Sequence, residues 1–123
     1  MDQPLGRYAG LWCEVTEAIN CLQSEGPEDT MAITFELGSR LLLQAKTVSD
    51  KSAAMIMQRE LIESGVALDK FLEMVSAHGG NHADIASFLT LHLPAEETVL
   101  SAQHSGTLST MITKLVGFAT AYL

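Results

Sequence analysis

Apolar side chains recur every three or four residues through most of the first two thirds of the chain, and this spacing predicts amphipathic helices. Four apolar stripes follow one another. In chain order they are Leu11, Val15, Ala18, Ile19 and Leu22; Met31, Ile33, Phe35, Leu37, Leu41, Leu42 and Ala45; Ala53, Ala54, Ile56, Met57, Leu61 and Ile62; and Leu68, Phe71, Leu72 and Val75. Segments 24–27, 64–65 and 79–80 are rich in Gly, Ser and Pro, and they end the first, third and fourth expected helices.

Local signals refine these helices. The acidic pair Glu28-Asp29 suits the N-terminus of the second helix, because carboxylates are favoured at the positive end of the helix dipole. Ser49 stands where an N-cap of the third helix is expected. Inside the second helix, Gly38 and Ser39 are small enough to admit a neighbouring helix closely.

The pattern changes after a short apolar segment, residues 85–91, that precedes Pro94. The stretch "ETVLSAQHSGTLSTMI", residues 97–112, carries β-branched residues around a Ser105-Gly106 turn signal and predicts a β-hairpin. The last stretch, "TKLVGFATAYL", is again typical of a helix and stops without a capping glycine. The expected fold class is therefore mostly α with a small β-hairpin.

Composition places the 123 residues among single-domain globular chains, because 47% of them are hydrophobic and 18% are charged. Seven Lys and Arg against 15 Asp and Glu give a net charge of -8, which argues against nucleic-acid binding. No apolar run reaches the roughly 18 residues of a membrane span. Cys13 and Cys21 lie eight positions apart and match neither a redox pair nor a zinc half-site, so we expect free thiols and a cytoplasmic location.

Candidate catalytic groups are few. The sequence lacks GxGxxG, GxxxxGK[ST], HExxH, GxSxG and CxxC motifs. His78 and His82 have ligand spacing for a helix, but two glycines separate them, so loop histidines are the simpler interpretation. His104 lacks an orienting carboxylate nearby in the sequence and is expected in a plain turn. We therefore expect no catalytic and no cofactor-binding residue in this chain.

Paired carboxylates on the first expected helix are a further candidate site. Glu14 and Glu17 lie three positions apart and face roughly the same side, and such pairs can bind a cation or transfer protons. From the spacing alone, a solvated acidic face near the helix N-terminus is the simpler interpretation. Trp12 is more often a core or interface residue than a stacking platform.

Several motifs in a fixed order resemble one known family. The opening "MDQPLGRYAG" and the following "EVTEAI" resemble an internal loop and helix of the bacterial pyrimidine-nucleoside phosphorylase and thymidine phosphorylase family. The similarity continues through "SEGPED", "ELGSRLLLQAK" and "ESGVALDKFLEMVSAHGGN". It is good over residues 1–81 and loose beyond them.

The resemblance implies a piece of a larger glycosyltransferase. The family cleaves pyrimidine nucleosides with phosphate to give a free base and a pentose 1-phosphate, and it works as a homodimer. Residues 1–93 would be the helical portion of its α/β domain, and residues 94–123 the start of its C-terminal α+β domain. The phosphate loop and the base-binding Arg, Ser and Lys precede the loop that opens this chain. Met1 is therefore expected to be an internal loop residue or a new start, and both ends of the chain resemble cut ends.

One family site maps onto this chain in part. Some members bind a monovalent cation, potassium, through two loop carbonyls and one helix carboxylate, and by motif position these belong to Leu5, Tyr8 and Glu17. Hard oxygen ligands suit such an ion. The other ligands lie outside this chain, so we do not expect the chain to hold the ion alone. No organic cofactor is implied.

The chain departs from the family at Leu11, Trp12 and Cys13, where the family has Asn and small residues. If that Asn fixes the loop, its role is lost here, which leaves the activity of the parent enzyme open.

Three interpretations remain from the sequence. The first is an inactive fragment of a phosphorylase, and the alternative is a stand-alone helical interaction or assembly module derived from that family. A parent related to the anthranilate phosphoribosyltransferase is a third possibility, against which the "QPLG" loop argues. Apolar stripes that would need a sheet to cover them favour self-association as a homo-oligomer.

Overall fold

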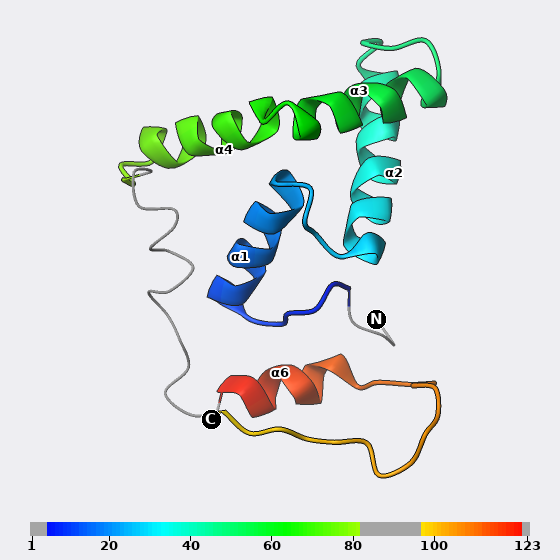
Figure 1. Ribbon diagram of the computed structural model, residues 1–123, viewed down its shortest axis with the longest axis vertical. Helices are drawn as coiled ribbons and strands as arrows, with labels where there is room; N and C mark the ends of the chain where they lie inside the picture. Colours follow the sequence, from blue (N-terminus) through cyan, green and yellow to red (C-terminus); the bar gives the residue numbers. More distant parts are fainter. Residues whose placement is uncertain (1–4, 82–96, 122–123) are drawn as a thin grey trace.

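The computed structural model describes residues 5–81 and 97–121, and these residues form five helices (Figure 1). They are α1 (Leu11–Leu22), α2 (Glu28–Gln44), α3 (Lys51–Glu63), α4 (Val66–Ala77) and α6 (Thr113–Ala121). The predicted mostly helical class is confirmed: α1 to α4 lie where the four apolar stripes predicted helices, and α6 lies in the last stretch, which was also expected to be helical. Within the described residues, every helix is too short or too polar to cross a membrane.

The first four helices pack around a corner. α3 and α4 follow one another almost in line, α2 packs against α3, and α1 lies in the angle between α2 and α4 (Figure 1). The interhelical packing joins α2 with α3, α3 with α4, and α1 with α4. This arrangement brings the start of α1 and the start of α2 to the same end of the molecule (Figure 1).

The α2–α3 contact depends on small side chains and one amide. Ser39 and Ala54 are fully buried, with 0% exposure. Gln58 Nε2 donates to Ser39 Oγ at 2.9 Å, to the Phe35 carbonyl at 3.2 Å and to the Ala54 carbonyl at 3.1 Å. A Cβ atom on Gly38 would overlap Gln58 Oε1. The prediction that Gly38 and Ser39 admit a neighbouring helix is therefore confirmed.

The N-cap of α3 is Asp50, and the prediction of Ser49 is wrong by one position. The Asp50 carboxylate accepts the Ala53 N–H at 2.9 Å, and the Ser49 hydroxyl donates to that carboxylate at 3.0 Å. These bonds, the Ala53 N–H first, hold the pKa of Asp50 below its ordinary value. Asp50 directly precedes the first helical residue, so its side chain reaches an unpaired N–H group that Ser49 does not.

The predicted β-hairpin is wrong. Residues 97–112 form an irregular segment with a bend at residues 103–104, and none of the described residues lies in a strand. An isolated two-stranded hairpin is only marginally stable and needs a further layer on its apolar face. Here Val99 and Leu100 are 77% and 92% exposed, so no such layer covers them. The expected helix after the segment is present as α6, and residues 85–91 lie outside the described residues.

We predict that Gly38→Ala lowers the free energy of unfolding by about 1 kcal/mol. Alanine is the better helix former by ~1 kcal/mol, but its Cβ displaces Gln58 and its three hydrogen bonds, and this loss outweighs the gain. Urea unfolding followed by circular dichroism measures the effect. In a Gln58→Ala background the same substitution should stabilise the protein instead. Equal stabilisation in both backgrounds would show that Gln58 does not determine the α2–α3 spacing.

Candidate functional site

The opening loop, residues 5–10, is held by carboxylates from two helices. The Gly6 N–H donates to Asp29 Oδ2 at 3.0 Å, the Arg7 N–H to Glu17 Oε1 at 2.8 Å and the Gly10 N–H to Glu14 Oε1 at 2.8 Å. Asp29 lies in the first turn of α2, whereas Glu14 and Glu17 belong to α1. The loop is thus fixed to the starts of both helices.

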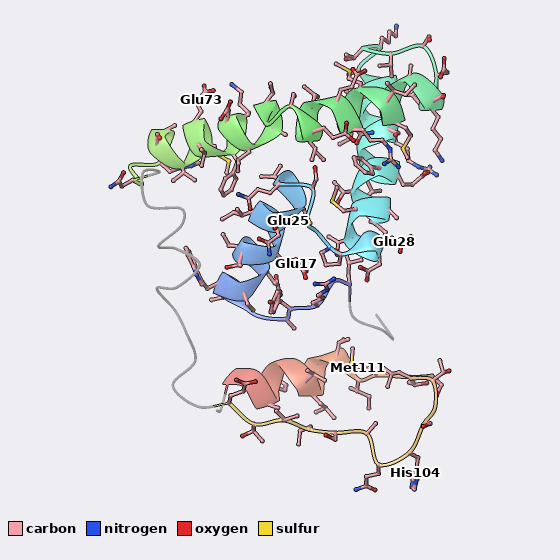
Figure 2. The ribbon with its side chains drawn as sticks, in the orientation of Figure 1. Glu17, Glu25, Glu28, Glu73, His104 and Met111 are labelled. Carbon is pink, nitrogen blue, oxygen red and sulfur yellow. The ribbon has the colours of Figure 1, made fainter. Side chains whose placement is uncertain are left out.

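Glu17 is the buried member of this set. It is 7% exposed and lies on the side of α1 that faces the opening loop and α2 (Figure 2). Gly6 has φ +73, and a Cβ atom there would overlap Glu17 Oε2 and lie 2.9 Å from Thr30 Oγ1. Glycine is therefore required at position 6 both for the left-handed backbone and for the close approach of the carboxylate.

The three residues predicted from the sequence lie together. Leu5, Tyr8 and Glu17 line one cavity of about 330 Å³, which we call the Glu17 cavity; its other lining residues are Glu14, Ala18 and Thr30. These residues include two carboxylates, those of Glu14 and Glu17, and two hydroxyl groups, those of Tyr8 and Thr30. Such donors suit a hard cation rather than a soft metal.

A site of this kind differs from a transition-metal site. Within residues 5–81 and 97–121, no three His, Cys, Asp or Glu side chains gather where they could hold a metal ion. A ligand set made largely of backbone carbonyls, with one carboxylate, needs no such cluster. The oxygen atoms of the lining residues are of the kind that a hard cation binds, and Glu17 is the buried carboxylate among them.

Two ionisable groups near the opening loop have shifted pKa values. Burial, followed by the charges of Glu17 and Asp29, raises the pKa of the Cys21 thiol. The Gly6 and Thr30 N–H groups, in that order, lower the pKa of Asp29. These shifts favour Asp29 as a carboxylate and Cys21 as a protonated thiol, and both cysteines are free. A nucleophilic thiolate is therefore disfavoured at Cys21.

The interpretation of Glu14 and Glu17 as one solvated acidic face is correct only for Glu14. Glu14 is exposed, yet it reaches back to the N–H of Gly10, the N-cap of α1. Glu17 is buried because the opening loop folds over it, and helical spacing does not reveal such a contact. The sequence analysis missed Asp29 and Thr30 as site residues, because their local sequence indicates only the start of a helix.

Leu11, where the chain departs from the family, is 95% exposed at the start of α1. Gly10, the N-cap of α1, offers no side chain to cap the helix. The Glu14–Gly10 hydrogen bond fixes this end of the loop.

The histidines form no catalytic group among the described residues. His78 is exposed at the end of α4, with its Nδ1 atom 3.1 Å from the Met74 carbonyl oxygen. His104 lies at the tip of the irregular segment 97–112 (Figure 2). His82 lies outside the described residues, so the predicted loop position of the His78–His82 pair is not tested.

Comparison with known proteins gives one consistent result. No family model matches the chain. The chain is 33% identical over all 123 residues to the pyrimidine-nucleoside phosphorylase of Staphylococcus haemolyticus and 32% identical over the same length to that of Bacillus subtilis, and it covers 28% of each. It is 43% identical over 81 residues, 66% of the chain, to the thymidine phosphorylase of Metamycoplasma hominis, of which the match covers 30%. The predicted resemblance is confirmed, and the chain spans less than a third of the length of these relatives.

We predict that Gly6→Ala destabilises the protein more than Gly65→Ala. Both glycines have positive φ, +73 and +81, so each substitution incurs the ~1–2 kcal/mol cost of a left-handed alanine. Only the Cβ at position 6 also displaces Glu17 and leaves the Arg7 N–H unpaired, which adds roughly 1–3 kcal/mol; Gly65 has open space around it. Urea unfolding and the exchange rate of the Arg7 amide measure the difference. Equal effects of the two substitutions would contradict the close contact of Glu17 with Gly6.

Proposed function

We propose that this chain is a segment of a nucleoside phosphorylase-like pentosyltransferase. In that enzyme a pyrimidine nucleoside and phosphate give the free base and a pentose 1-phosphate. The observation that carries the proposal is the similarity of the entire chain to only 28% of pyrimidine-nucleoside phosphorylases. In this proposal, phosphate and nucleoside bind to parts of the polypeptide outside these 123 residues, and the chain alone is inactive.

The part that this chain contributes is one half of a monovalent cation site. The backbone carbonyls of Leu5 and Tyr8 and the carboxylate of Glu17 would hold potassium in the Glu17 cavity. When bound, the ion supplies a positive charge that neutralises the buried carboxylate and draws the loop carbonyls together. The burial of Glu17 and its bond to the Arg7 N–H support this proposal, because a buried carboxylate is costly unless its charge is compensated.

The contribution of these residues to the reaction is positioning. The opening loop is held to α1 by Glu17 and Glu14 and to α2 by Asp29, so its shape is fixed before any substrate binds. A phosphate site built next to such a loop would gain from this preorganisation. Residues 1–93 would then belong to the α/β domain of the enzyme and residues 94–123 to the start of its C-terminal domain. The free thiols fit a cytoplasmic enzyme.

The relatives named above give no support to the alternative of a stand-alone interaction module. That alternative and the fragment share one expectation, however, because many apolar side chains lack a partner. Ile33, Leu37 and Leu41 recur every four residues along α2 and are 46%, 57% and 65% exposed. Further exposed apolar residues lie on α1, α3, α4 and α6; they include Leu11, Ile56, Val66, Met74 and Phe118. We propose that the isolated chain buries part of this surface as a homo-oligomer.

We predict that the isolated chain elutes from a size-exclusion column at a position that depends on its concentration. Self-association through apolar faces follows mass action, so dilution shifts the elution toward the monomer. Leu37→Glu, which places a charge on the exposed stripe of α2, should shift it further. A monomer at every concentration would contradict the proposed oligomer.

We predict that the isolated chain releases no uracil or thymine from uridine or thymidine and phosphate. The Bacillus subtilis relative is the positive control. A chimera of the same relative, with its matched 28% replaced by this chain, should retain phosphorolysis that depends on potassium. In this chimera, Glu17→Gln should raise the potassium concentration needed for half-maximal activity more than ~10-fold. Turnover by the isolated chain would contradict the fragment proposal. A folded but inactive chimera would contradict the functional equivalence of the segment.

A further inference from the structure

We propose that Asp29 is a positioning residue of the opening loop: it orients the Leu5–Gly6 peptide group and so directs the Leu5 carbonyl oxygen toward the Glu17 cavity. The ligand role of that carbonyl rests on the proposed function. The effect of Asp29 on the peptide group does not, and the two are separable by experiment.

The hydrogen bond to Asp29 fixes the direction of the Leu5–Gly6 peptide group. The Gly6 N–H donates to Asp29 Oδ2 at 3.0 Å. A peptide group is planar and trans, so its N–H and its C=O point in opposite directions. Because the Gly6 N–H points at Asp29, the Leu5 carbonyl oxygen points away from that carboxylate.

The Leu5–Gly6 peptide group joins two residues that line different cavities. Asp29 lines a different cavity of about 570 Å³ together with Gly6, Arg7, Pro27, Glu28 and Ala32. Leu5 lines the Glu17 cavity of about 330 Å³. The Leu5–Gly6 peptide group therefore lies between the two cavities, with its N–H on the side of Asp29. Its carbonyl points the opposite way, and in this proposal it faces the Glu17 cavity, which Leu5 lines.

The Asp29 carboxylate is itself held in place at the start of α2. Its other oxygen, Oδ1, accepts the Thr30 N–H at 2.8 Å in the first turn of α2. α2 is in turn held on α3 through the bonds of Gln58 to Ser39 and Phe35. The orientation of the loop peptide group thus follows the position of α2, a helix that contributes none of the three proposed cation ligands.

The carboxylates of Glu17 and Asp29 hold two successive peptide groups of the loop. Glu17 accepts the next N–H along the chain, that of Arg7, at 2.8 Å. The left-handed backbone of Gly6, with φ +73, lets these successive N–H groups reach carboxylates on different helices. Glu17 alone therefore fixes the Gly6–Arg7 peptide group and leaves the Leu5–Gly6 group to Asp29.

The test uses NMR spectroscopy of the full ¹³C,¹⁵N-labelled chain. It compares the wild type with Asp29→Ala, Asp29→Asn and Glu28→Ala. Glu28 is a matched control, because it has the same charge, lies beside Asp29 at the start of α2 (Figure 2) and makes no hydrogen bond to the loop. The readouts are the exchange rate of the Gly6 amide and the ¹³C shift of the Leu5 carbonyl. The potassium dependence is measured separately, as phosphorolysis by the Bacillus subtilis chimera described above, at an ionic strength held constant with choline chloride.

Asp29→Ala should speed exchange of the Gly6 amide by about 10-fold and move the Leu5 carbonyl signal. Asp29→Asn should restore most of the wild-type behaviour, since its amide oxygen also accepts a hydrogen bond. Glu28→Ala should change neither signal. Unchanged Gly6 and Leu5 signals in Asp29→Ala, or equal changes in Glu28→Ala, would overturn the inference. If phosphorolysis by the wild-type chimera does not depend on potassium while Asp29→Ala still alters Gly6 and Leu5 in the chain, the cation proposal fails and the positioning role stands.

Discussion

The buried carboxylate of Glu17 is the constraint on which the organised end of this structure depends. It lies on α1, accepts the Arg7 N–H and is covered by the loop that it holds. Glycine at position 6 is the only residue that lets this carboxylate approach the backbone so closely. The loop, the start of α1 and the start of α2 are consequently one unit, joined by polar contacts more than by apolar burial.

The remainder of the helical corner is held in a similar way. Its buried apolar residues are few: Ile19, Phe35 and Ala54. The α2–α3 contact adds the amide of Gln58, bonded to the hydroxyl of Ser39 and to two carbonyls. Hydrogen bonds fix the geometry of such an interface but contribute modest net stability. Apolar side chains of α2 such as Ile33, Leu37 and Leu41 stay exposed.

The sequence predicted correctly the features that depend on neighbouring residues, and it failed where contacts with other parts of the chain decide the structure. The four apolar stripes and the helical character of the last stretch depend on local sequence, and all five expected helices are present in the described residues. The hairpin at 97–112 failed because a strand pair needs a covering layer that local pattern does not supply. Ser49 failed as a cap because Asp50, which directly precedes α3, is the residue whose side chain reaches the Ala53 N–H group. Leu5, Tyr8 and Glu17 were named through the resemblance, and the three residues line one cavity.

The sequence by itself determined the helices, the breaks between them, the acidic surface and the relationship to part of the pyrimidine-nucleoside phosphorylases. All of these are properties of spacing, composition or motif order, which a linear chain carries in full. Only the tertiary structure decided that Glu17 is buried while Glu14 is not, and that Asp29 reaches the loop from another helix. The physical reason is that Gly6 and Asp29 are 23 positions apart, and a contact over that separation exists only once α1 and α2 have packed.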